Sequence, residues 1–130
     1  MTDGLILVVE DNETNLKLVR DILQFEGYDV LEARTAEDGV TLATERIPDL
    51  VLMDIQLPGM DGVEALHRLR GGAETASIPV VAVTALAMKD DRTRLLAAGF
   101  DGYLEKPISA RTLRDDVRGF LDGREAVSGH

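Results

Sequence analysis

The strongest constraint on the fold is a short apolar run that recurs along the chain. It appears as Leu5 to Val9, Leu50 to Met53 and Ile78 to Val83. Runs of this length are too short for helices, and a continuous apolar run is typical of a strand buried on both faces. Strands of this kind occur in parallel sheets whose two faces are covered by helices. The pattern therefore predicts an α/β protein built on a parallel sheet.

Helical patterns fill the intervals between these runs. Leu16, Val19 and Leu23 recur at helical spacing, and Gly27 suits the end of that helix. Further strands are predicted at 29–33 and 101–104, and further helices at about 35–47, 61–70, 87–98 and 109–121. Strand and helix thus alternate five times. We therefore predict a doubly wound, five-stranded parallel sheet with five helices, the flavodoxin-like arrangement.

Residues that favour helix ends support these boundaries. The stretch from Thr35 to Asp38 resembles a capping box, and Asp61 and Ser109 are suitable N-caps. The composition turns polar and aperiodic after residue 122. We therefore assign residues 1–122 to one domain and predict a disordered tail over 123–130.

Composition narrows the function. The chain has no cysteine, so disulfides and thiolate metal sites are excluded. The chain has 14 basic residues (lysine and arginine) and 24 acidic residues (aspartate and glutamate), which gives a net charge of −10. This negative charge disfavours direct binding to nucleic acid. The same charge permits divalent cations and basic protein partners. No apolar run approaches the ~20 residues of a membrane span, and no secretory signal is visible, so we expect a cytoplasmic protein.

Polar residues follow the predicted strands at their carboxyl ends. Glu10-Asp11 follows the first, Asp54 ends the third, Thr84 follows the fourth and Lys106 the fifth. Ligands of open α/β sheets bind outside the carboxyl ends of the strands. We therefore expect these three acids, one hydroxyl and one ammonium to lie together at one edge of the sheet.

Three carboxylates at one edge repel one another, and a hard divalent cation relieves the repulsion. At ~4 Å and an effective dielectric constant of ~20, each like-charged pair costs about 4 kcal/mol. Mg²⁺ fits best, because one or two carboxylates together with a phosphate typically hold it. One carboxylate is then free to act as the nucleophile of a phosphoryl transfer, with Lys106 and Thr84 stabilising the phosphoryl oxygens.

Each of these residues also has an ordinary structural interpretation. Asp54 suits a turn, and Glu10 and Asp11 suit a helix N-terminus. Thr84 is an acceptable strand-end hydroxyl, and Lys106 an acceptable surface residue. Their joint occurrence at the strand ends favours the functional interpretation over four separate structural ones.

From Leu5 to about Leu121 the chain resembles the receiver domain of two-component response regulators. The resemblance rests on Val9-Glu10-Asp11-Asn12, on the stretch from Leu52 to Gly62, on Val83-Thr84-Ala85 and on Lys106-Pro107. The most similar members are single-domain cell-cycle regulators and the receivers of hybrid kinases. The chain can therefore be a free-standing regulator or a receiver segment of a longer hybrid histidine kinase, and both alternatives stay open. The starting Met1 favours the free-standing regulator.

The resemblance implies a chemistry for each site residue. Asp54 would accept a phosphoryl group from a phosphohistidine in a histidine kinase or phosphotransferase. Asp11 and Asp54 would ligate Mg²⁺, or Mn²⁺ in its place, together with the backbone carbonyl of Gln56. Glu10 would act on the metal through water. Lys106 would contact the phosphoryl group, and its bond to Pro107 would be cis.

The resemblance also implies a switch without a separate catalytic domain, so we do not expect a conventional enzyme. On phosphorylation Thr84 would move toward the phosphoryl group and Tyr103 would turn inward. The face formed by 87–98, the fifth strand and the last helix would then change its affinity for a downstream protein. The protein would be a monomer or a phosphorylation-dependent dimer, with neither nucleic acid nor membrane as a partner.

Two other functions are weighed against the receiver. An aspartate-nucleophile phosphatase typically uses a second acid two residues after the nucleophile, but Gln56 stands there. A flavin or nucleotide binder needs a phosphate loop, and Gly71-Gly72 lacks the Lys-Ser/Thr that completes one. Both functions are less favoured for these reasons.

Overall fold

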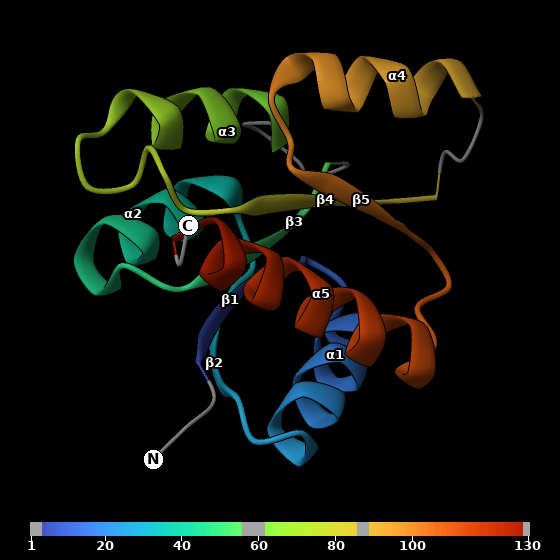
Figure 1. Ribbon diagram of the computed structural model, residues 1–130. Helices are drawn as coiled ribbons and strands as arrows, with labels where there is room; N and C mark the ends of the chain where they lie inside the picture. The colour runs from blue at the N-terminus through green and yellow to red at the C-terminus, as the bar shows by residue number, and fades with distance from the viewer. Residues whose placement is uncertain (1–3, 56–61, 86–88, 129–130) are drawn as a thin grey trace.

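The computed structural model describes residues 4–55, 62–85 and 89–128. Strands and helices alternate along the chain: β1 (Leu5–Val9), α1 (Glu13–Phe25), β2 (Asp29–Ala33), α2 (Ala36–Arg46), β3 (Leu50–Asp54), α3 (Gly62–Gly71), β4 (Val80–Thr84), α4 (Lys89–Ala98), β5 (Gly102–Glu105) and α5 (Ala110–Ser128). The strands form one parallel sheet in the order β2-β1-β3-β4-β5. The predicted doubly wound fold is therefore confirmed (Figure 1).

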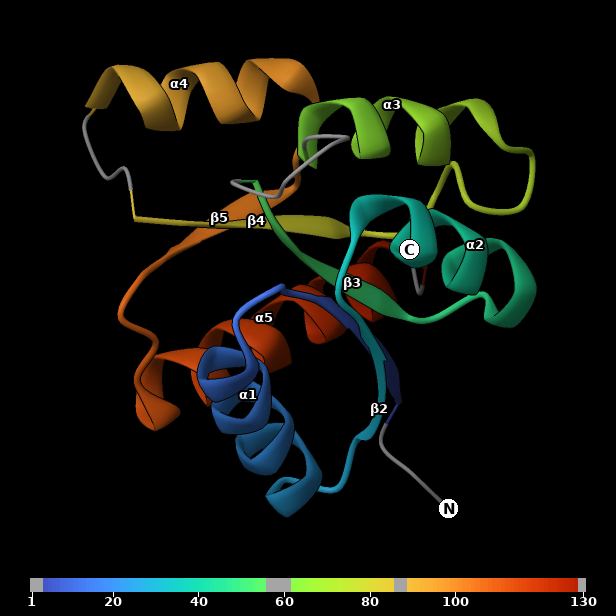
Figure 2. The same cartoon turned by 180° about the vertical axis from the view of Figure 1, so that it is seen from behind.

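The sheet separates two apolar layers, because successive side chains of a strand point to opposite faces. In β1, Leu7 and Val9 join one layer and Ile6 and Val8 the other. The first layer lies beneath α2, α3 and α4, and the second beneath α1 and α5. Figures 1 and 2 show the two groups of helices on opposite sides of the sheet. Burial on both faces explains why β3 and β4 are apolar up to their last residues, Asp54 and Thr84.

Capping side chains place the helix starts where the sequence predicts them. The N–H of Asp38 donates to Oγ1 of Thr35 at 3.1 Å, and the N–H of Thr112 donates to Oγ of Ser109 at 3.2 Å. Each bond satisfies a backbone donor that has no partner within its own helix. The predicted cap Asp61 lies outside the described residues.

The last helix is longer than the sequence pattern predicts. The tail was expected from Gly123, but the backbone of α5 is helical to Ser128. Arg124, Glu125 and Ala126 have high helix propensity, so a helix that is already packed against the sheet can extend through them. The helix therefore continues past Gly123, while the domain boundary at residue 122 and a disordered tail over 123–130 stay predictions. Within the described ranges, no helix combines the length and apolar content needed to cross a bilayer.

Gly102 allows α5 to pack closely on β5. A Cβ atom at Gly102 would meet the ring of Phe120, with Cε1 at 2.7 Å. Gly119, the neighbour of Phe120 on α5, has no atom within 4 Å of its equivalent position. The two glycines therefore differ in packing although they belong to the same contact region.

We predict opposite effects of alanine at these two positions. Gly102→Ala should lower the free energy of unfolding by about 1–3 kcal/mol, because the Phe120 ring must leave its place. Gly119→Ala, the matched control, should raise it by up to about 1 kcal/mol, since alanine is the better helix former. Urea unfolding measures both changes, and equal effects would contradict the packing argument.

Candidate functional site

The carboxyl edge of the sheet gathers the polar residues that the sequence singled out. Glu10 follows β1, Asp54 ends β3, Thr84 ends β4 and Lys106 follows β5. These strands are adjacent and parallel, so their ends meet at one edge. The topology, rather than closeness in the sequence, therefore builds the site.

Three carboxylates lie together at this edge. Glu10, Asp11 and Asp54 each have an oxygen within 4.8 Å of the others. Glu10 and Asp54 are buried, with exposed fractions of 4% and 2%, whereas Asp11 is exposed. Two buried acids this close require a compensating positive charge.

Lys106 supplies that charge. Its Nζ lies 2.8 Å from Oδ2 of Asp54 and 3.1 Å from Oε1 of Glu10. The backbone N–H of Lys106 donates to the carbonyl of Thr84 at 2.8 Å, which fixes the residue beside the end of β4. The Lys106–Pro107 bond is cis, as the resemblance implied.

Asn12 holds Glu10 in place from the other side. The N–H of Asn12 donates to Oε2 of Glu10 at 3.2 Å, and Oδ1 of Asn12 accepts from the N–H of Asn15 at 3.0 Å. The second bond caps the N-terminus of α1. The start of the helix and the orientation of the buried acid therefore depend on the same residue.

Sequence reasoning missed the direct contact between Glu10 and Lys106. It assigned Glu10 to the metal through water and Lys106 to the phosphoryl group. The signal was the length of glutamate, whose additional methylene, relative to aspartate, extends its reach toward the ammonium group.

Burial and the neighbouring acid change the proton affinity of Glu10. The pKa of Glu10 is raised from 4.5 to about 7, mainly by burial and then by the hydrogen bond and negative charge of Asp54, while the N–H of Asn12 and the ammonium of Lys106 oppose the rise. Burial also opposes the charge on Lys106, but the contacts with Asp54 and Glu10 outweigh burial and raise the pKa of Lys106 above 10.5. The ammonium group is thus firmly charged, while the two buried acids repel each other.

The donor set fits a divalent metal ion. Three carboxylates with oxygens within 4.8 Å of one another offer the hard oxygen ligands that Mg²⁺ prefers. Within the described residues, the ammonium of Lys106 contacts two of these carboxylates, so the three acids carry more negative charge than one lysine balances. The acidic cluster can therefore bind a metal ion. The backbone carbonyl of Gln56, which the resemblance added to the ligands, lies outside the described residues.

Thr84 and Tyr103 lie on one face of the sheet. Thr84 is buried at the end of β4, and Tyr103 is half-buried on the neighbouring strand β5. Tyr103 pairs with Ala82, and both belong to the layer beneath α2, α3 and α4. Strand alternation places Thr84 on the same face as Ala82. The two residues that the resemblance linked in a switch are therefore diagonal neighbours on the sheet.

A doubly wound sheet with a buried acid–lysine cluster at its carboxyl edge defines a receiver-type signalling domain. Residues 6–118 match the family model described as the response regulator receiver domain. The chain is 42% identical over 116 residues to the polar-differentiation response regulator DivK of Brucella ovis, covering 89% of this chain and 94% of that protein. The chain therefore belongs to the response regulator receiver domain family of two-component systems, whose members generally signal without a separate catalytic domain.

Solved structures agree with this family. The chemotaxis response regulator CheY4 of Vibrio cholerae superposes with a TM-score of 0.87 at 25% identity, covering 92% of this chain and 100% of that one. A receiver domain of a Pseudomonas aeruginosa sensor histidine kinase has a TM-score of 0.85 at 32% identity, covering 92% and 98%. That structure is described with a magnesium ion coordinated in its active-site cleft.

We predict that Glu10→Gln stabilises the metal-free protein at high pH. Because the folded-state pKa of Glu10 lies above its unfolded value, the folded state holds the proton more tightly between about 4.5 and 7. The stability that this proton provides is complete below the unfolded pKa and is lost as the pH rises through about 7. With EDTA at pH 8, the variant should therefore unfold with a free energy about 1–2 kcal/mol higher than that of the wild type.

The difference should shrink as the pH falls to 5, where Glu10 is protonated in the folded wild type. Urea unfolding at several pH values tests this, with Glu37→Gln on the exposed surface of α2 as the control. A stability difference that is independent of pH would contradict the assignment.

Proposed function

We propose that the protein accepts a phosphoryl group on Asp54 from a phosphohistidine of a histidine kinase or phosphotransferase. The observation that carries the proposal is the buried Asp54 carboxylate held 2.8 Å from the Lys106 ammonium, with Glu10 and Asp11 beside it. A carboxylate can act as a nucleophile and form an acyl phosphate. Family membership supports a kinase or phosphotransfer partner as the donor.

The transfer breaks the N–P bond of the phosphohistidine and forms an O–P bond to a carboxylate oxygen of Asp54. The electron pair of the broken bond stays on the imidazole nitrogen of the donor. Catalysis of such a transfer depends on positioning and on stabilising charge at the phosphoryl oxygens. We assign the positive charge to Lys106 and a hydroxyl donor to Thr84. Asp54 loses its direct ion pair in this step, and the phosphoryl oxygens become the new partner of Lys106.

We propose Mg²⁺ as the metal, with Mn²⁺ as a substitute. Asp11 and Asp54 would hold it together with the carbonyl of Gln56, and Glu10 would act through water. When bound, the ion neutralises charge on the acids and on the incoming phosphoryl group. The magnesium ion in the receiver of the P. aeruginosa kinase supports this choice.

We propose that phosphorylation is read out on the surface formed by α4, β5 and α5. A phosphoryl group adds about −1.5 to −2 charge and strong acceptors next to Thr84. Thr84 and Tyr103 share a sheet face, which supports a coupled change of both side chains. A downstream protein that binds this surface would then distinguish the two states. The protein acts as an acceptor and switch rather than as an enzyme with many turnovers.

We predict that acetyl phosphate with Mg²⁺ produces a single phosphoryl adduct by intact mass. Asp54→Asn should abolish the adduct, and Lys106→Gln should lower its rate of formation by at least tenfold because the positive charge is lost. Asp21→Asn, which removes an exposed aspartate of α1, is the control and should behave as the wild type. Rapid release of phosphate from acetyl phosphate without an adduct would instead favour an aspartate-nucleophile phosphatase.

We predict that Mg²⁺ raises the melting temperature. A ligand at ten times its dissociation constant stabilises the folded state by about 1.4 kcal/mol. Asp11→Asn should remove most of this shift because it deletes a ligand, while the Asp21→Asn control should keep it. Differential scanning fluorimetry across a Mg²⁺ titration measures the effect. An equal shift in Asp11→Asn and the wild type would exclude Asp11 as a ligand.

A further inference from the structure

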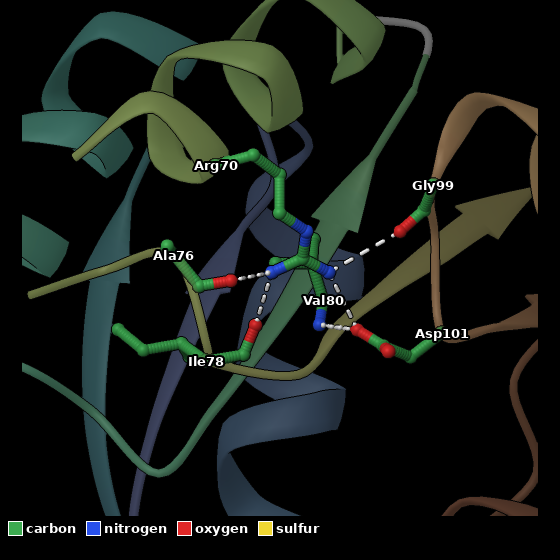
Figure 3. Close-up of polar contacts among 6 residues, drawn as sticks. All are labelled: Arg70, Ala76, Ile78, Val80, Gly99 and Asp101. Atoms are coloured by element: carbon green, nitrogen blue, oxygen red, sulfur yellow. Dashed lines mark hydrogen bonds and ion pairs between the residues drawn. The ribbon is translucent and has the colours of Figure 1, made fainter. Parts of the chain in front are cut away.

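Arg70 joins three chain segments at the end of the sheet opposite the candidate site. Its Nη1 donates to the carbonyls of Ala76 at 3.1 Å and Ile78 at 2.6 Å. Its Nη2 donates to the carbonyl of Gly99 at 3.2 Å and to Oδ2 of Asp101 at 2.7 Å. Figure 3 shows the planar guanidinium between these partners, which come from the entry to β4 and the connection from α4 to β5.

Asp101 completes this arrangement, which we call the Arg70 clasp (Arg70, Ala76, Ile78, Val80, Gly99 and Asp101). The Oδ2 atom of Asp101 also accepts from the N–H of Val80 at 2.8 Å, and the N–H of Asp101 donates to the carbonyl of Val80 at the same distance. The first residue of β4 is thus bonded twice to the residue before β5. An exposed ion pair alone contributes little, but this one also satisfies backbone groups at two strand entries.

The clasp also fixes the end of α4. The N–H of Gly99 donates to the carbonyl of Leu96 and the N–H of Phe100 to that of Leu95, a Schellman motif with Gly99 at φ 115°. The carbonyl of Gly99 then accepts from Arg70. Arg70 therefore connects the C-terminal ends of α3 and α4.

The candidate site lies at the other end of the same strands. From Val80 to Thr84, β4 rises about 13 Å at roughly 3.3 Å per residue. The clasp holds the entries of β4 and β5 and the C-terminal end of α4. Thr84 and Lys106, which would contact a phosphoryl group, stand at the strand exits. A packed unit that is held at one end and displaced at the other turns about the end that is held.

We propose that Arg70 is a positioning residue of the switch. The clasp is the fixed point about which α4 and β5 reorient when Asp54 is phosphorylated. Without it, displacement at Thr84 loosens the region locally and does not reorient the surface formed by α4, β5 and α5. This inference rests on the proposed phosphoryl acceptance, and it adds a residue that touches neither the phosphoryl group nor the metal.

The test compares hydrogen exchange of segment 93–105 before and after phosphorylation by acetyl phosphate with Mg²⁺. In the wild type, phosphorylation should change the exchange rate of this segment. In Arg70→Ala the adduct should form with the wild-type yield, but the phosphorylation-dependent change should shrink at least twofold. Arg68→Ala is the matched control, because Arg68 lies in the same turn of α3 with a side chain 58% exposed and a long, 3.9 Å ion pair with Glu64.

A purely structural role would give a different result. The hydrogen-exchange rate of segment 93–105 in Arg70→Ala would then rise by the same factor with and without phosphorylation. The change that phosphorylation causes would persist. That outcome overturns the inference. So does a phosphorylation-dependent change in hydrogen exchange that is as large in Arg70→Ala as in the wild type. If Arg70→Ala does not fold, Arg70→Lys and Asp101→Asn replace it. A lysine cannot span all four acceptors, and an asparagine keeps an acceptor for Val80 but loses the charge.

Arg70→Lys and Asp101→Asn should both reduce the effect of phosphorylation on hydrogen exchange. An effect as large as in the wild type in both variants would overturn the inference. Absence of any adduct in the wild type would instead refute the proposed function itself. The two failures are therefore distinguishable by intact mass, before exchange is measured.

Discussion

The ammonium group of Lys106, shared by Glu10 and Asp54, is the interaction on which the site depends. Two acids that are almost fully buried would be costly neighbours without it. Its position follows from the sheet, since its backbone N–H is bonded to the end of β4. The same ammonium stabilises the resting site and is the group best placed to meet incoming negative charge. Charge balance in the folded protein and the proposed phosphoryl transfer would therefore use one side chain.

The parallel sheet gives the molecule two functionally different edges. Carboxyl ends of strands collect the acids, the hydroxyl and the lysine, whereas the opposite edge carries the hydrogen bonds of Arg70. Each edge contains one end of β4 and one end of β5, and these two strands are neighbours in the sheet. In the proposed switch, the hydrogen bonds at the far edge hold the strand entries while the strand exits are displaced.

Much of this could be predicted from the sequence because strong local signals agree with the topology. The apolar runs identified the strands, and Thr35, Ser109 and Gly27 marked helix ends that the structure confirms. The acids were predicted to converge because parallel strands impose it. What escaped prediction depends on distances between remote residues. Glu10 meets Lys106, and Arg70 meets Asp101, across separations that no periodic pattern encodes. The length of α5 escaped because the polar, aperiodic composition after residue 122 carries no apolar period, although residues such as Arg124 and Glu125 have high helix propensity.

The division of the interior into two layers has a consequence for how such a chain can change over generations. Side chains beneath α1 and α5 do not share a cluster with those beneath α2, α3 and α4. Changes of volume in one layer can be compensated by partners in that layer, because distant sites with no shared partner act additively. The core beneath α1 and α5 can therefore change while the core beneath α2, α3 and α4 keeps its packing.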